Sequence, residues 1–168
     1  MNRRRLMLSN SKESESPILY DNGVVSSMAG SFVKGFVYNT ACIARDTGEY
    51  IELATPAINR RASMYTEKTF GLSKYSKLCI SIAAMPESGN FYVSLTTADP
   101  ELLYTEQTDT GIVQYKSIDA GAQVFEWNFR DEKYSGQDFD DAAKYHLCIY
   151  AGTKAASSVL RIDRIWLE

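Results

Sequence analysis

The sequence predicts an all-β domain, a jelly-roll sandwich of two packed antiparallel sheets, and three observations support this prediction. The chain has 168 residues, which suits one domain of ordinary size. Eleven Tyr, seven Phe and two Trp favour strands, because broad rings pack well on pleated surfaces and lose rotamer freedom in helices. From Ile18 onward, short β-type segments follow one another between turn residues, without an internal repeat or a long amphipathic helical pattern.

Residues 1–16 are expected to form a flexible arm ahead of the folded domain. The arm contains three consecutive arginines starting at Arg3, and its second half is a polar run of low complexity that has little to bury. Pro17 follows as a boundary residue. We therefore place the sandwich at residues 17–168.

Turn residues divide the first third of the domain into short strands. Asn22 and Gly23 both tolerate a positive φ and predict a tight turn. Residues 30–38 are expected to form a strand in which Gly35 marks a bulge. Residues 45–48 contain the Asp and Gly of a second tight turn, so the segments on either side are expected to pair as a hairpin.

Residues 78–85 form the clearest strand in the sequence. Leu, Ile, Ile and Ala occupy every second position, so one face of the strand is apolar. A turn at residues 86–90 and a second alternating segment at residues 91–96 follow. We therefore expect the two alternating segments to pair as a hairpin.

Two further strands are expected at residues 111–117 and 122–130. In the second, Phe125, Trp127 and Phe129 share one face, whereas charged and amide side chains share the other. That contrast predicts that the three rings lie in the core.

The final strand, residues 158–168, contains a break in its alternation. Ile162 and Ile165 are both apolar but fall on opposite faces of a regular strand. A bulge near Asp163 and Arg164 would bring both side chains into the core.

The charge and the hydropathy pattern exclude several classes of partner. The net charge of −3 provides no basic field for nucleic acid. The longest apolar runs are strand-sized and shorter than the ~20 residues that span a bilayer. Only three apolar residues follow the arginines of the arm, too few for a signal peptide. We therefore expect a soluble protein made in the cytoplasm, with neither nucleic acid nor membrane as a partner.

The cysteines and the single histidine do not favour catalysis or a transition-metal site. Cys42, Cys79 and Cys148 each lie in an apolar segment without CxxC spacing, which predicts buried, reduced thiols. His146 lies within an expected strand, residues 145–151, and no GxSxG elbow accompanies it. Because P-loop and GxGxxG motifs are also missing, we expect neither an enzyme nor a cofactor.

Carboxylate pairs leave a glycoside hydrolase as an alternative, since that chemistry needs two carboxyl groups at a defined separation. The candidate pairs are Glu49 with Glu52 and Asp131 with Glu132. Within each pair the spacing directs the two side chains to opposite faces of a strand, so neither pair is specific.

Acidic turns offer two candidate sites for a structural calcium ion, which prefers hard oxygen ligands. The candidates are Asp21 with Asn22, and the acidic run of Asp138, Asp140 and Asp141. The spacing of an EF-hand loop is absent, and ordinary turn or helix-start chemistry also explains these residues.

Four tyrosines are candidate glycan-binding residues, because sugar sites use aromatic rings as stacking surfaces with amides and carboxylates beside them. Tyr92 and Tyr115 lie on polar strand faces, and Tyr104 and Tyr134 lie in expected loops. Packing within the core is the alternative for such rings.

Two segments carry a resemblance to known proteins. Residues Arg3–Leu8, with the polar run behind them, resemble the start of small prophage-encoded structural proteins of Gram-positive gut bacteria. The strand-rich body, closing with residues 159–168, resembles galactose-binding-like domains and carbohydrate-binding modules. In those jelly rolls a closing strand of this kind pairs near the start of the domain. The resemblance implies the architecture, but it identifies no ligand residue in this chain.

The leading functional hypothesis is a non-enzymatic phage or prophage structural or accessory protein whose jelly roll attaches to cell-surface glycan. Residues Arg3–Leu8 would then tether it to a virion or tail assembly, and fold analogy suggests a homo-oligomer. A stand-alone carbohydrate-binding module is the first alternative. A β-sandwich glycoside hydrolase is the second.

Overall fold

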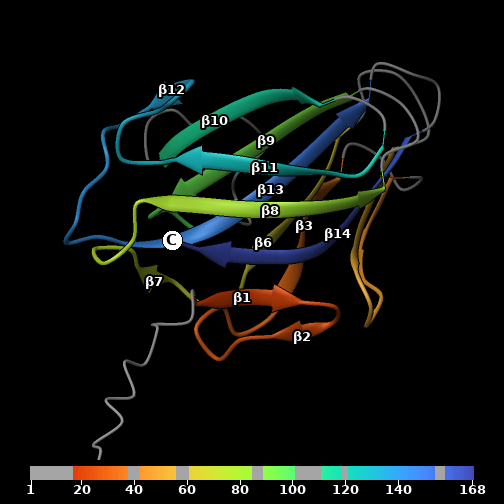
Figure 1. Cartoon of the computed structure of the whole chain (residues 1–168), viewed down its shortest axis with the longest axis horizontal. Helices are drawn as coiled ribbons and strands as arrows, with labels where there is room; N and C mark the ends of the chain where they lie inside the picture. The colour runs from red at the N-terminus through yellow and green to blue at the C-terminus, as the bar shows by residue number, and fades with distance from the viewer. Residues whose placement is uncertain are drawn as a thin grey trace, which may run out of the picture.

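The computed structural model shows two stacked antiparallel sheets (Figure 1). The structure describes residues 17–37, 42–55, 61–84, 89–100, 111–118, 121–153 and 158–168. These residues form fourteen strands, three of them only two residues long, and no α-helix. Among them there is accordingly no helix with the length and hydropathy needed to cross a membrane. The predicted all-β sandwich is confirmed, whereas the predicted arm, residues 1–16, lies outside the described part of the chain.

The first sheet contains the strand that closes the domain. Its main path runs β11-β8-β14-β1-β2, and β5 adds to β14 and carries β4. Its strands are β1 (Ile18–Asp21), β2 (Val24–Val25), β4 (Ile43–Asp46), β5 (Ile51–Thr55), β8 (Lys77–Ala84), β11 (Gln123–Asn128) and β14 (Ser158–Leu167). Because β14 pairs with β1, the end of the described chain lies beside its beginning, as the resemblance implied.

The second sheet is built on the longest central strand, β13. Its main path runs β12-β10-β9-β13-β6-β3, and β7 pairs with the start of β13. Its strands are β3 (Phe32–Val37), β6 (Arg61–Thr66), β7 (Phe70–Gly71), β9 (Gly89–Thr96), β10 (Gly111–Ile118), β12 (Ser135–Gly136) and β13 (Lys144–Thr153). In Figure 1 β8, β14 and β1 lie toward the viewer, with β13, β6 and β3 behind them.

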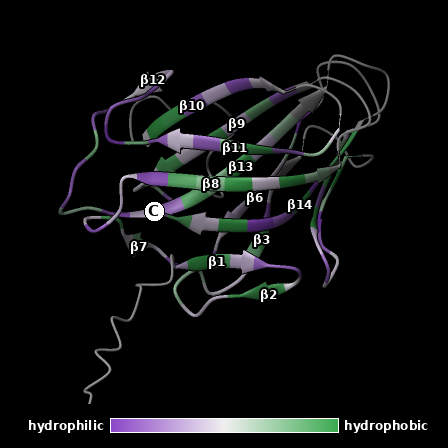
Figure 2. Ribbon diagram, viewed as in Figure 1, coloured by the Kyte–Doolittle hydropathy of each residue, from purple (hydrophilic) through white to green (hydrophobic). Residues whose placement is uncertain are grey.

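The core lies between the two sheets, and hydrophobic residues along β14 are interrupted by hydrophilic ones, whereas β8 is mostly hydrophobic (Figure 2). The predicted inward rings Phe125, Trp127 and Phe129 are all buried, and Trp127 Nε1 donates a 2.7 Å hydrogen bond to the Glu132 carbonyl. The three cysteines are buried and form no disulfide, as predicted. The two-residue period of a strand therefore predicts correctly that the face carrying these three rings is buried.

The predicted hairpin of residues 78–85 with 91–96 is wrong. β8 pairs with β11 and β14 in the first sheet, whereas β9 pairs with β10 and β13 in the second. Both strands alternate because each has one buried face. Alternation is the same for strands of either sheet, so it does not determine which strands pair.

Two local predictions in the first sheet are confirmed. The pairing of β14 with β8 shifts on both sides of Ile162, and Ile162 and Ile165 are both fully buried, so the bulge near Asp163 exists. In the β1–β2 hairpin, Asn22 and Gly23 have φ angles of 46° and 86° and form the two-residue turn.

Two predictions about residues 30–55 are met in part or in full. The pairing of β3 with β6 shifts between Lys34 and Val37, which confirms the bulge around Gly35. The pairing of β4 with β5 places Asp46 opposite Ile51, so the hairpin turn is residues 47–50, two residues later than predicted. The Thr47 hydroxyl accepts a 3.1 Å hydrogen bond from the Tyr50 backbone N–H, which stabilises this later turn.

Candidate functional site

The outer face of the second sheet gathers aromatic and polar side chains that point away from the core. On β9 the odd-numbered residues Phe91, Val93 and Leu95 are buried in the core, so Tyr92 and Ser94 point outward. The strand register aligns such residues in rows across the sheet. One row holds Tyr115, Tyr92, Tyr150 and Ser63, and the next holds Val113, Ser94, Cys148, Tyr65 and Val33.

A stack of three tyrosine rings, capped by an arginine, crosses one side of this outer face. The rings of Tyr92 and Tyr115 lie 4.7 Å apart, and the rings of Tyr115 and Tyr134 lie 5.4 Å apart. The Arg61 guanidinium lies 5.5 Å from the centre of the Tyr92 ring. We call Arg61, Tyr92, Tyr115 and Tyr134 the tyrosine stack. A hydrogen bond of 2.7 Å from the Tyr134 backbone N–H to the Val113 carbonyl holds the last ring beside β10.

The stack limits which ring surfaces can meet a ligand. Tyr115 has a ring on each side, so it presents an edge and a hydroxyl, which donates to Asn90 Oδ1 at 2.9 Å. Tyr92 is likewise enclosed between Arg61 and Tyr115. Tyr134 is 59% exposed and is the ring with an accessible surface. The structure thus brings together three of the four predicted tyrosines, and Tyr104 lies outside the described residues.

Two further tyrosines of this face were missed from the sequence. Tyr65 and Tyr150 pack with Cys148 as a small buried cluster, against which Tyr92 also lies. Burial raises the pKa of the Cys148 thiol to about 12, so this cysteine is held as a neutral thiol. The signal was available: His146, Cys148 and Tyr150 alternate along one strand and must share a face.

A pocket of about 540 Å³ lies at the far side of the same face, and we call it the His146 pocket. Its lining residues come from β3, β6, β13 and the segments that follow β6 and β9. They are Val33, Tyr65, Glu67, Asp99, Pro100 and His146. A pocket of this volume is large enough to hold a small molecule.

His146 is fixed in this pocket by two neighbours. Its Nδ1 lies 2.7 Å from the Thr66 carbonyl, and its ring meets the Tyr65 ring edge-on at 6.3 Å. A carbonyl only accepts hydrogen bonds, so Nδ1 carries the hydrogen and Nε2 is the nitrogen left for a ligand. The lone strand histidine is therefore a pocket residue.

Two of the four candidate hydrolase carboxylates, Glu52 and Asp131, have local partners. Glu52, on β5 of the first sheet, is almost fully buried between Arg45 at 2.7 Å and Arg161 at 3.6 Å. Asp131 accepts a 2.8 Å hydrogen bond from Asn128 within an exposed turn. Both are engaged in local contacts, which is how structural carboxylates behave.

The predicted calcium ligands also have local partners. The Asn22 side chain donates to Asp21 Oδ1 at 2.8 Å. In the second candidate run, Asp138 pairs with Lys133 and Asp141 pairs with Arg130, and Asp140 Oδ1 accepts a 2.9 Å hydrogen bond from the Ala142 backbone. No group of three or more His, Cys, Asp or Glu side chains within the described residues is arranged to hold a metal ion. Calcium at Asp21 and Asn22 stays a prediction.

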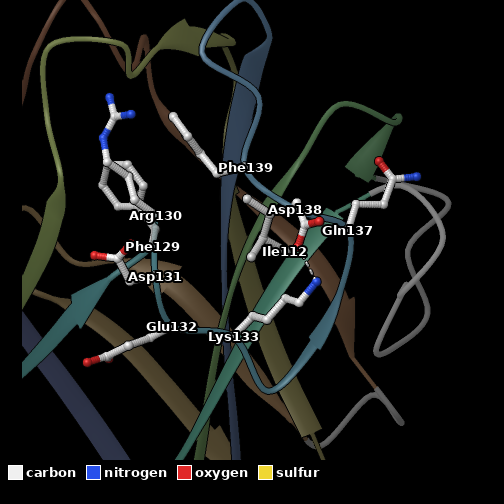
Figure 3. A pocket seen from close by; sticks show the side chains of 9 residues that line it. All are labelled: Ile112, Phe129, Arg130, Asp131, Glu132, Lys133, Gln137, Asp138 and Phe139. Atoms are coloured by element: carbon white, nitrogen blue, oxygen red, sulfur yellow. Dashed lines mark hydrogen bonds and ion pairs between the residues drawn. The ribbon is translucent and has the colours of Figure 1, made fainter.

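A second cavity, of about 50 Å³, lies beside the turn after β11 (Figure 3). Two contacts join residues that line it: Figure 3 shows Lys133 reaching Asp138, and the Arg130 guanidinium lies 4.7 Å from the centre of the Phe139 ring. Arg130 also donates to the carbonyls of Tyr75 and Ser73 at 2.7 and 2.8 Å. The cavity is far smaller than a sugar site. The contacts of Arg130 stabilise the packing of the turn after β11 against the segment before β8.

Comparison with known proteins identifies the fold but no sequence relative. No protein-family model matches the sequence, and no curated protein matches it. The structure is similar to the family 11 carbohydrate-binding module of a cellulosomal cellulase of Clostridium thermocellum, with a TM-score of 0.54 and 14% identity over 90% of this chain and 93% of that chain. It is also similar to a family 29 carbohydrate-binding module of Piromyces equi, with a TM-score of 0.50 and 10% identity over 90% and 88%.

An exo-β-agarase is similar over 91% of this chain, with a TM-score of 0.57 and 15% identity, but the match covers only 25% of the agarase. The two carbohydrate-binding modules, by contrast, match over nearly the whole of both chains. At these identities the likeness establishes the jelly-roll sandwich alone, since one fold hosts many functions.

Proposed function

We propose that this domain is a carbohydrate-binding module whose glycan ligand lies across the outer face of the second sheet. The observation that carries the proposal is the presence on one face of both the tyrosine stack and the His146 pocket. The glycan-binding modules that share the fold add support, because the family 29 structures include one with bound cellulohexaose.

The dimensions of the face suit a chain of several sugar units. From β10, beside Tyr134, to β3, which contributes Val33 to the pocket, there are four strand spacings, or roughly 19 Å at ~4.8 Å each. One apolar face of a sugar ring would stack on the exposed ring of Tyr134. The hydroxyl groups of the sugar would meet the tyrosine edges, Asn90 and the acceptors of the pocket.

Two other functions are less well supported. The phage structural role depends on residues 1–16, which lie outside the described residues, and nothing in the fold favours it over a carbohydrate-binding module. In the hydrolase alternative, one carboxylate of each predicted pair has a local partner: Glu52 is paired with two arginines, and Asp131 accepts a hydrogen bond from Asn128. Glycan binding needs neither a tether nor such a pair.

The test is binding of the full chain to a panel of soluble polysaccharides by affinity electrophoresis, followed by calorimetry on any that retard it. Tyr134→Ala is expected to weaken binding about tenfold, because it removes the exposed stacking surface. Tyr50→Ala is the matched control, since this half-buried tyrosine lies under Arg161 in the first sheet. Silence of the whole panel, or unchanged affinity of Tyr134→Ala, would overturn the proposal.

A further inference from the structure

The His146 pocket differs from the rest of the outer face in its charge. Within the described residues its lining includes the carboxylates of Glu67 and Asp99 and neither Lys nor Arg. Lys68, next to Glu67, directs its ammonium to the Ser27 carbonyl at 3.4 Å. Lys144, two residues before His146 on the same face of β13, is exposed and does not line the pocket. The pocket is therefore negatively charged.

Arg61, at the other end of the outer face, lies too far from the pocket to neutralise it. Along β13, His146 and the residue opposite Arg61, Gly152, are six residues apart, or roughly 20 Å at ~3.3 Å per residue. That separation is about twice the Debye length at about 0.1 M salt, so the interaction between the two regions is largely screened. The pocket and the arginine cap of the stack thus act as independent electrostatic regions.

The remaining chemistry of the pocket is that of hydrogen-bond acceptors on an apolar wall. In the neutral form of His146, Nε2 is an acceptor, because Nδ1 keeps its hydrogen for the Thr66 carbonyl. Glu67 Oε2 is oriented by the Ser31 hydroxyl, which donates to it at 3.0 Å. Val33 and Pro100 supply aliphatic surface. A complementary ligand has an aliphatic ring face and a positively charged group with several hydrogen-bond donors.

We propose that the His146 pocket binds the protonated primary amine of an amino-sugar unit, so that the module prefers glycans containing free hexosamine. The inference rests on the proposed function, because it names the sugar class that this face selects. An ammonium group supplies three donors and a charge that attracts Glu67 and Asp99. An N-acetyl group at the same position has one donor and no charge, and a hydroxyl has one donor and no charge.

Three β-1,4-linked oligosaccharides of equal length separate these possibilities, since they differ only at carbon 2 of each unit. They are oligomers of glucosamine, of N-acetylglucosamine and of glucose. Isothermal titration of the full chain at neutral pH and low salt is expected to give roughly fivefold tighter binding of the glucosamine oligomer than of the glucose oligomer. The preference should shrink at high salt, because exposed charges are screened.

Variants assign the preference to the pocket. Glu67→Gln and Asp99→Asn keep the shape of each side chain and should each reduce the preference, and the double variant should abolish it. Glu126→Gln, on the exposed face of the first sheet, removes the same charge elsewhere and should leave the preference intact. Thermal unfolding of each variant verifies that it is folded.

Equal affinity for the glucosamine and glucose oligomers would overturn the inference, and so would an equal loss of preference in Glu126→Gln, which would indicate net charge alone. If the glucose oligomer binds in a Tyr134-dependent way without any preference for glucosamine, the inference fails and the proposed function stands. If none of the three oligomers nor any polysaccharide of the panel binds, both fail.

Discussion

The rings of Tyr92 and Tyr115 lie 4.7 Å apart at an interplanar angle of 39°, on directly opposite residues of β9 and β10. The contact stabilises the sheet without any ligand, because side chains on directly opposite residues of an antiparallel pair interact favourably. The stack therefore combines two roles. The inner rings stabilise the sheet, and the outer ring, Tyr134, meets solvent.

The two roles predict losses of stability of different size for two alanine substitutions. Tyr115→Ala should lower the free energy of unfolding by about 2 kcal/mol, since it removes two ring contacts and the hydrogen bond to Asn90. Tyr134→Ala should lower it by less than about 0.5 kcal/mol, because that ring is mostly exposed. Urea unfolding of both variants measures the difference, and equal losses would show that the stack is not organised in this way.

Gly23 and Gly48 form a matched pair for testing the β1–β2 turn. Both have a positive φ, 86° and 84°, but a Cβ on Gly23 would lie 1.9 Å from the Gly48 carbonyl oxygen, whereas a Cβ on Gly48 would meet open space. Gly48→Ala should cost about 1 kcal/mol from backbone strain alone, and Gly23→Ala should cost at least about 2 kcal/mol. Denaturant unfolding gives both values. Equal losses of stability would mean that the two turns move apart at no cost and that the close approach of Gly23 to Gly48 does not matter.

Calcium is expected to stabilise the domain if Asp21 and Asn22 hold it. The Asn22 backbone N–H donates to the Asp163 carbonyl at 2.8 Å, and Asp163 Oδ1 is buried without a hydrogen-bond partner among the described residues. A ligand that binds only the folded state raises the midpoint of thermal unfolding. Calcium should raise it relative to a chelator, and Asp21→Ala should remove the increase. Asp131→Ala, in an exposed turn, is the control that should keep it. An unchanged midpoint in the native protein would exclude the site.

Alkaline pH should destabilise the domain through its buried thiols. Burial raises the pKa of Cys148 from 9.0 to about 12. Because the pKa is higher in the folded state, the contribution to stability is complete below pH 9.0 and is lost as the pH rises toward 12. Urea unfolding should therefore show a decline in stability above pH 9.0, and a shallower decline in Cys148→Ala. Identical slopes for the two proteins would contradict this assignment. Cys79, whose pKa burial raises to about 12, adds to the decline in both.

Local patterns in the sequence determined the features that depend on one strand or one turn. The ring triplet at Phe125, Trp127 and Phe129 required only the two-residue period of a strand, because its opposite face is polar. The bulge beside Asp163 followed from the change of phase between Ile162 and Ile165, since a core admits both only if an extra residue is inserted. The turn at Asn22 and Gly23 followed from their tolerance of a positive φ.

Tertiary structure alone decided which strands meet. Alternation along residues 78–85 and 91–96 gives each strand a buried face, but partners are chosen by packing between segments far apart in the chain, so the two strands entered different sheets. The sequence offered Tyr92, Tyr115 and Tyr134 as separate candidates, and pairing of β10 with β9 and β12 made them a stack. The His146 pocket draws its lining from residues between Val33 and His146, and no local pattern connects positions that only the folded sheet places together.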